Sequence, residues 1–95
     1  MRRRSYGIAL RVNGRLITEV VIDPHYEKNH PDMTDAVILG LVRSLDQCEF
    51  SAEESDGEFD FYMLDRIPFA GKEYRLVWCM QKERRYIGVI NAFRR

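Results

Sequence analysis

The chain has few cysteines, no long hydrophobic run and no excess of either charge. Its 95 residues include two cysteines, Cys48 and Cys79. Two cysteines are too few for a disulfide framework and lack the spacing of metal ligands, so we interpret them as reduced thiols of a cytoplasmic protein. The basic start at residues 1–4 precedes an alternating segment that is too short and too polar for a signal peptide or a membrane span. We therefore expect one unexported domain over residues 1–95 with no membrane partner.

The sequence also lacks the short motifs of common catalytic sites. It has no glycine-rich phosphate loop, no HExxH zinc motif, no CxxC pair and no nucleophile elbow. His25 and His30 are five positions apart, so they would not share one face of a helix, and no third ligand lies at a suitable spacing. We expect neither a metal nor a cofactor.

The net charge is zero, but the charges are segregated along the chain. Residues 46–60 hold seven acids and no Lys or Arg, so this stretch carries −7 and the remainder +7. A neutral total argues against a nucleic-acid partner, because Lys and Arg bind phosphates by displacing counterions, whereas the segregation permits one. The acidic stretch is either a solvated loop or a surface that repels nucleic acid or binds a basic partner.

The first part of the chain predicts a hairpin and then a helix. Segments 6–12 and 15–22 have strand patterns and are separated by Asn13-Gly14, the strongest short-range hairpin signal. Apolar residues then recur at helical spacing over residues 33–47, after a candidate N-cap at Asp32. Gly40 within this segment costs about 1 kcal/mol relative to alanine and permits a close approach to a strand.

The second half predicts three further strands. They cover residues 59–64, residues 67–80 with a turn at Gly71-Lys72, and residues 85–93. We therefore predict an α+β fold in which one main amphipathic helix packs on an antiparallel sheet of about five strands. The sheet face away from the helix would present Arg75 and Asn91.

Four residues carry side chains that suit metal-independent cleavage of RNA. Such cleavage needs a base for the 2′-hydroxyl, cations that stabilise the phosphorane and an acid for the leaving oxygen. Histidine titrates near neutrality, and both histidines precede a helix whose N-terminus attracts phosphate. The candidate catalytic residues are His25, Lys28, His30 and Arg75. Alternatively, the two histidines are surface or capping residues.

Basic and aromatic residues near the C-terminus suggest contacts with RNA. Arginines bind the backbone, and aromatic rings stack on bases. The candidate RNA-binding residues are Arg84, Arg85, Tyr86, Asn91, Arg94 and Arg95. Alternatively, the arginines are solvated strand ends and the aromatic residues belong to the core.

Residues 20 to 95 combine an Asp, a Lys, an Asn and a His before the helix, a Gly-Lys turn before the strand Tyr74-Arg75-Leu76-Val77-Trp78, and a basic end to the last strand. In these features the chain resembles the RelE/BrnT group of small toxin ribonucleases. The resemblance implies the barnase/colicin/RelE-type fold, metal-independent cleavage of messenger RNA and a cognate antitoxin protein. At the matching positions, Lys28 and His30 would belong to the site before the helix, Arg75 would contact phosphate, and Arg94 would be the basic residue that ends the last strand.

Two functions are therefore expected as alternatives. The first is a toxin-like endoribonuclease that cleaves RNA by general acid/base catalysis as one half of a toxin–antitoxin pair. The second is a non-enzymatic module that binds a protein through its acidic loop or an exposed strand edge. An exposed final strand would also allow pairing with a second copy as a homodimer.

Overall fold

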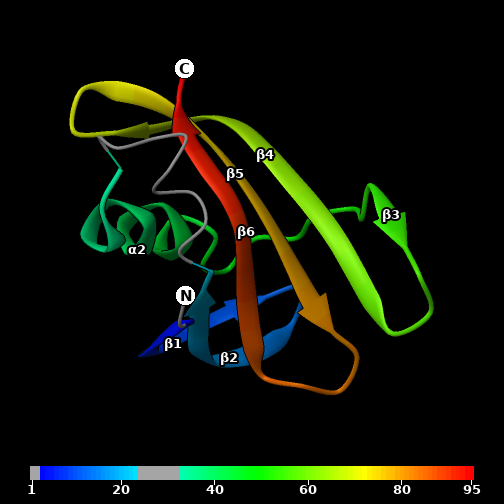
Figure 1. The fold of residues 1–95 in the computed structure, drawn as a ribbon. Coiled ribbons are helices and arrows are strands. Elements are labelled where there is room, and N and C mark those ends of the chain that lie inside the picture. The colour runs from blue at the N-terminus through cyan, green and yellow to red at the C-terminus, as the bar shows by residue number, and fades with distance from the viewer. Residues whose placement is uncertain (1–2, 24–32) are drawn as a thin grey trace.

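The computed structural model describes residues 3–23 and 33–95. Within these residues a six-stranded sheet packs against one helix (Figure 1). The elements are β1 (Arg4–Val12), β2 (Arg15–Ile22), α2 (Asp35–Arg43), β3 (Glu54–Ser55), β4 (Phe59–Phe69), β5 (Lys72–Gln81) and β6 (Tyr86–Arg94). The predicted α+β class is confirmed. The sheet has one strand more than predicted because the acidic stretch contributes the short β3.

The strand order in the sheet is β1-β2-β6-β5-β4-β3. Neighbouring strands are antiparallel except β2 and β6, which are parallel. The prediction of a wholly antiparallel sheet is therefore wrong at this pair, because periodicity identifies strands and not their neighbours. The prediction of an exposed final strand is also wrong. Because β6 lies between β2 and β5, it offers no edge to a second copy.

The hairpin of β1 and β2 forms where the sequence predicts it. Asn13 and Gly14 form its turn with φ angles of 53° and 74°. Positive φ at both central positions is what a two-residue turn needs to match the twist of the strands. At the other end of the sheet, Ala70 and Gly71 connect β4 to β5 with φ angles of 52° and 78°. The predicted turn at Gly71-Lys72 is therefore one residue too late, and residues 67–69 belong to β4 rather than to the next strand.

Helix α2 is shorter than the predicted segment 33–47. Its N-cap is Thr34, whose hydroxyl accepts a hydrogen bond from the Val37 amide at 3.2 Å. The predicted cap, Asp32, lies outside the described residues. The chain turns after the helix, although Leu45 remains fully buried, which is why the apolar spacing continues past the helix end. The described residues contain no helix long and apolar enough to cross a membrane.

The core lies between α2 and one face of the sheet. Trp78 of β5 is fully buried, and its ring stacks on Tyr62 with centroids 5.3 Å apart and meets the edge of Phe50 at 5.2 Å. The predicted close approach at Gly40 is confirmed, because an added Cβ would lie 2.3 Å from Cε1 of Phe69 on β4. Helix α2 therefore covers one face of the sheet and buries the core residues there.

Candidate functional site

Helix α2 covers one face of the sheet. No described helix or strand covers the opposite face, which we call the open face. Its side chains alternate along β4, β5 and β6 with the buried residues of the core. The open face of these three strands includes Phe59, Phe61, Met63, Asp65, Arg75, Val77, Cys79, Gln81, Tyr86, Gly88, Ile90, Asn91 and Phe93. A bulge near Val77 shifts the alternation of β6, so Asn91 lies opposite Val77 on the same face as Arg75.

Charged side chains from β4, from β5 and from the end of the chain meet on this face. Nη2 of Arg75 donates a hydrogen bond to Oδ2 of Asp65 at 2.9 Å, and Nη1 of Arg95 lies 3.1 Å from the same oxygen. The guanidinium of Arg75 lies over the ring of Phe93, 5.6 Å from its centroid, within range of a cation–π contact. We call Asp65, Arg75, Phe93 and Arg95 the arginine cluster.

The arginine cluster keeps a positive charge at neutral pH. The hydrogen bond from Arg75 lowers the pKa of the Asp65 carboxyl, and burial only partly opposes this effect. The same bond raises the pKa of Arg75. Two guanidinium groups share one ionised carboxylate, so the three charges sum to +1.

One donor of the arginine cluster has no acceptor. Nε of Arg75 is buried and lacks a hydrogen-bond partner among the described residues. A buried donor without a partner costs free energy. Because this nitrogen is shielded from solvent, an arriving anion would contact the exposed part of the Arg75 side chain. Asp65 and Arg75 are each about one third exposed, at 28% and 31% of their side-chain surface. An anion can therefore reach the pair.

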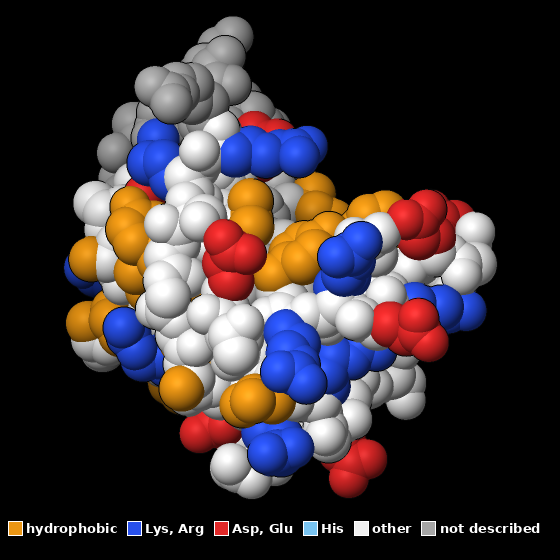
Figure 2. Space-filling model, turned by 90° about the horizontal axis from the view of Figure 1, so that it is seen from below, with side chains coloured by type: hydrophobic (Ala, Val, Ile, Leu, Met, Phe, Trp, Pro, Cys, Tyr) orange, Lys and Arg blue, Asp and Glu red, His pale blue; other side chains and the backbone are white. Residues whose placement is uncertain are grey.

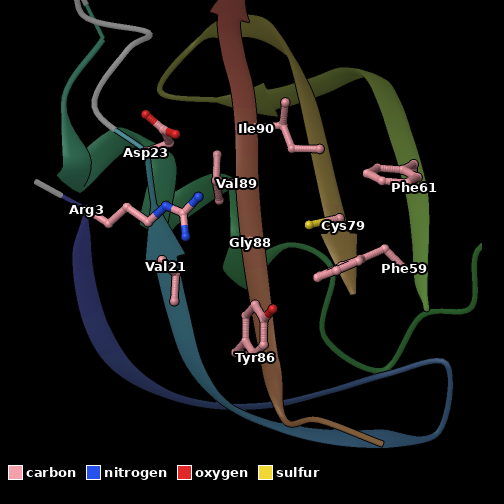
Figure 3. Close-up of a pocket in the computed structure, with 10 residues that line it drawn as sticks. All are labelled: Arg3, Val21, Asp23, Phe59, Phe61, Cys79, Tyr86, Gly88, Val89 and Ile90. Carbon is pink, nitrogen blue, oxygen red and sulfur yellow. The ribbon is translucent and has the colours of Figure 1, made fainter. Parts of the chain in front are cut away.

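Of the predicted catalytic residues, the structure places only Arg75. His25, Lys28 and His30 lie outside the described residues. Asp23, the last described residue before them, lines a cavity on the open face (Figure 3). Whether the two imidazoles face Arg75 therefore stays a prediction.

The predicted RNA-binding residues do not form one group. Arg84 and Arg85 are exposed in the turn between β5 and β6, whereas Arg94 and Arg95 lie at the far end of β6, roughly 27 Å away at about 3.4 Å per residue. Arg94 pairs with Tyr74, a core residue, so it is Arg95 that joins Arg75. The hydroxyl of Tyr86 donates to Gln81 at 2.9 Å.

Sequence reasoning missed Asp65 as a member of the site. Asp65 continues the alternation of Phe61 and Met63 on β4, so its face could have been inferred from the strand pattern. Its contact with Arg75 could not, because a bulge between Leu64 and Ile67 changes the register of β4 against β5.

A cavity of about 290 Å³ opens on the same face nearer the β5–β6 turn (Figure 3). Burial raises the pKa of the half-buried Cys79 thiol beside it, so this thiol is protonated at neutral pH. The lining residues are Arg3, Val21, Asp23, Phe59, Phe61, Cys79, Tyr86, Gly88, Val89 and Ile90.

The acidic stretch extends from the β3 edge of the sheet. Residues 51–58 are all exposed, and Figure 1 shows β3 beyond β4. Asp56 orders the turn into β4, because Oδ1 accepts hydrogen bonds from the amides of Glu58 and Phe59 at 3.0 and 2.7 Å. In the view of Figure 2, Lys and Arg side chains lie among smaller groups of Asp and Glu, so that view shows no field of one sign.

Residues 3–23 and 33–95 contain no cluster of three or more His, Cys, Asp or Glu side chains that could hold a metal ion. Comparison of the chain with models of protein families, with curated proteins and with solved structures found no match. The features that bear on function are therefore the geometry of the open face and the resemblance in the sequence.

Proposed function

We propose that this protein binds single-stranded RNA on the open face of its sheet and cleaves it without a metal, as the toxin-like endoribonuclease of a toxin–antitoxin pair. The observation that supports this most is the arginine cluster. It holds two guanidinium groups, a buried donor without an acceptor and an aromatic ring on a sheet face that α2 does not cover.

Binding would combine phosphate contacts with stacking. Arg75 and Arg95 offer charge-assisted hydrogen bonds to phosphate oxygens. Phe61, Tyr86 and Phe93 lie on the same face and offer rings to unpaired bases, which double-stranded RNA does not present. Because the chain has no net charge, we expect binding to depend on these local contacts rather than on a general basic field.

In the cleavage step, Arg75 would stabilise the charge that develops on the phosphorane. Asp65 would act as a positioning residue, because its carboxylate holds Arg75 and Arg95 together. The general base would be His25 or His30, and Lys28 would be a second cation. These roles come from the chemistry of the side chains and from the resemblance.

The test is cleavage and binding of a labelled single-stranded RNA in the presence of EDTA. We expect the purified chain to cleave it, and Arg75→Gln to abolish cleavage and weaken binding. Arg43→Gln is the matched control, because Arg43 is an exposed arginine at the end of α2 rather than on the open face. His25→Ala and His30→Ala separate the steps, since the variant that lacks the general base should bind RNA without cleaving it.

Failure of the wild-type chain to bind RNA would overturn this proposal. Equal losses in the Arg75→Gln and Arg43→Gln variants would also contradict it, because a general charge effect would then explain the binding.

The exposed acids support a second candidate function, the binding of a basic protein partner. Glu53, Glu54, Asp56 and Glu58 are exposed at the edge of the sheet, and the turn that carries them is ordered by Asp56. A lysine-rich peptide is a suitable probe. Its binding should weaken with salt and with Glu53→Gln and Glu54→Gln if this edge is a docking site, and an unaffected affinity would exclude it.

A further inference from the structure

We propose that the cavity on the open face holds one unstacked base of the bound RNA strand. This inference rests on the proposed function, because it names the part of the RNA that the open face recognises beyond the phosphates at the arginine cluster.

The hollow exists because a row of neighbouring residues across four strands has little side chain in its centre. Phe61 of β4 pairs with Cys79 of β5, Cys79 pairs with Gly88 of β6, and Gly88 pairs with Val21 of β2. The row thus has a large side chain at Phe61, a small one at Cys79, none at Gly88 and one of medium size at Val21. Figure 3 shows the gap above Gly88, between Val21 on one side and Cys79 and Phe61 on the other.

Gly88 is not required by the backbone at this position. It lies within the regular strand β6, and its φ is not positive. An added Cβ would lie 2.9 Å from Sγ of Cys79, so any other residue would press on that side chain. The glycine therefore provides space rather than a turn.

The walls of the cavity suit a flat ring. Phe59 and Phe61 have ring centroids 6.3 Å apart, and Tyr86 lies across the cavity on β6. A volume of about 290 Å³ lies just below the roughly 300–1,000 Å³ range of ligand pockets, so it has room for one ring system and not for a dinucleotide. Bases stack on aromatic side chains because each base has a π-face.

One cation stands at the rim. Figure 3 shows the Arg3 side chain reaching over β2 toward β6. Its charge is near enough to oppose the rise that burial causes in the pKa of Cys79 and of Tyr86. Asp23 also lines the cavity and lies beside Arg3 in Figure 3, so the rim carries one charge of each sign. Arg3 is the group there that can contact the phosphate of the nucleotide whose base enters the cavity.

The cavity and the arginine cluster are close enough for one strand to use both. Cys79 and Arg75 lie on the same face of β5, four residues apart, which is roughly 13 Å. A short RNA could thus place a phosphate at Arg75 and a base against Gly88.

The experiment measures the affinity of a short single-stranded RNA, and of the same RNA with an abasic nucleotide at each position in turn, by fluorescence anisotropy. We expect one abasic position to weaken binding to the wild-type chain by about tenfold, as the loss of one stacked base does. Cys79→Phe fills the cavity, so it should weaken binding of the intact RNA by a similar factor. In this variant, an abasic nucleotide at the sensitive position should cause no further loss of affinity.

Phe61→Ala and Met63→Ala form the matched pair, because both residues lie on the open face of β4 and only Phe61 lines the cavity. Phe61→Ala should weaken binding and Met63→Ala should not, which keeps the test valid if Cys79→Phe does not fold. RNA binding that depends on Arg75 but is unchanged by Phe61→Ala and by every abasic position would overturn the base site and leave the proposed function standing. No RNA binding by the wild-type chain would overturn both.

Discussion

Arg75 and Asp65 are joined across β5 and β4 by a 2.9 Å hydrogen bond, and Arg95 shares the same carboxylate oxygen. One carboxylate cannot neutralise two guanidinium groups, so Asp65, Arg75 and Arg95 together keep one positive charge. Substitution of Arg75 and substitution of Asp65 should therefore have different effects on the proposed RNA binding.

We expect Arg75→Gln to weaken RNA binding roughly tenfold and to make the negative slope of log affinity against log salt less steep by about 0.7, the loss of one phosphate contact on a single strand. Asp65→Asn removes a negative charge beside Arg75 and Arg95 but keeps an amide oxygen that can accept their hydrogen bonds, so it should leave the salt slope unchanged and the affinity no lower. Titrations at several salt concentrations measure both quantities. A purely structural ion pair would give the same loss in both variants.

The second prediction concerns acid stability. The folded pKa of Asp65 lies below the ordinary aspartate value of about 3.9, because Arg75 donates to its carboxylate. Its stabilisation is thus fully present above that ordinary value and is lost as the pH falls through the lower folded pKa. The difference in unfolding free energy between wild type and Asp65→Asn should be constant near neutrality and shrink below about pH 4. Urea unfolding measures it, and a difference that grows toward low pH would contradict the assignment.

The third prediction concerns the contact of α2 with β4. Alanine is about 1 kcal/mol better than glycine inside a helix. Gly40→Ala should nevertheless destabilise the fold by about 1–3 kcal/mol, because the new methyl group would overlap Phe69. In a Phe69→Ala background the same substitution should become neutral or stabilising. An equal cost of Gly40→Ala in both backgrounds, measured by thermal unfolding, would show that Phe69 is not the obstacle.

The fourth prediction separates the two cysteines. Cys48 is exposed, whereas Cys79 is half-buried and burial raises its pKa, which lowers the fraction of reactive thiolate. Iodoacetamide should therefore modify Cys48 well before Cys79 at neutral pH. Mass spectrometry of the timed reaction shows the order, with Cys48→Ser as the control that removes the fast phase. Faster modification of Cys79 would mean that its surroundings are more open than described.

Local signals in the sequence predicted local structure well. Asn13-Gly14 predicted the first hairpin because two positive φ angles are a property of those two residues. Alternation predicted strands in the last third, and helical spacing predicted α2. The helix ends were less certain, because Asp32 and Thr34 are both good caps and Leu45 remains buried beyond the last helical residue.

Relations between distant segments could not be predicted in the same way. Nothing in β2 or β6 alone indicates that they become parallel neighbours. The partnership of Arg75 with Asp65 depends on a bulge, and the cavity depends on the register that aligns Gly88 with Cys79. Arg75 was identified because a single strand pattern places it away from the core.

The most direct test of the proposed RNA site is the change in backbone amide chemical shifts when a short single-stranded RNA is added to the labelled protein. We predict the largest changes at the open-face positions of β4, β5 and β6, including Phe61, Arg75, Gly88 and Phe93. Changes confined to α2 or to residues 51–58 would contradict an RNA site on the open face.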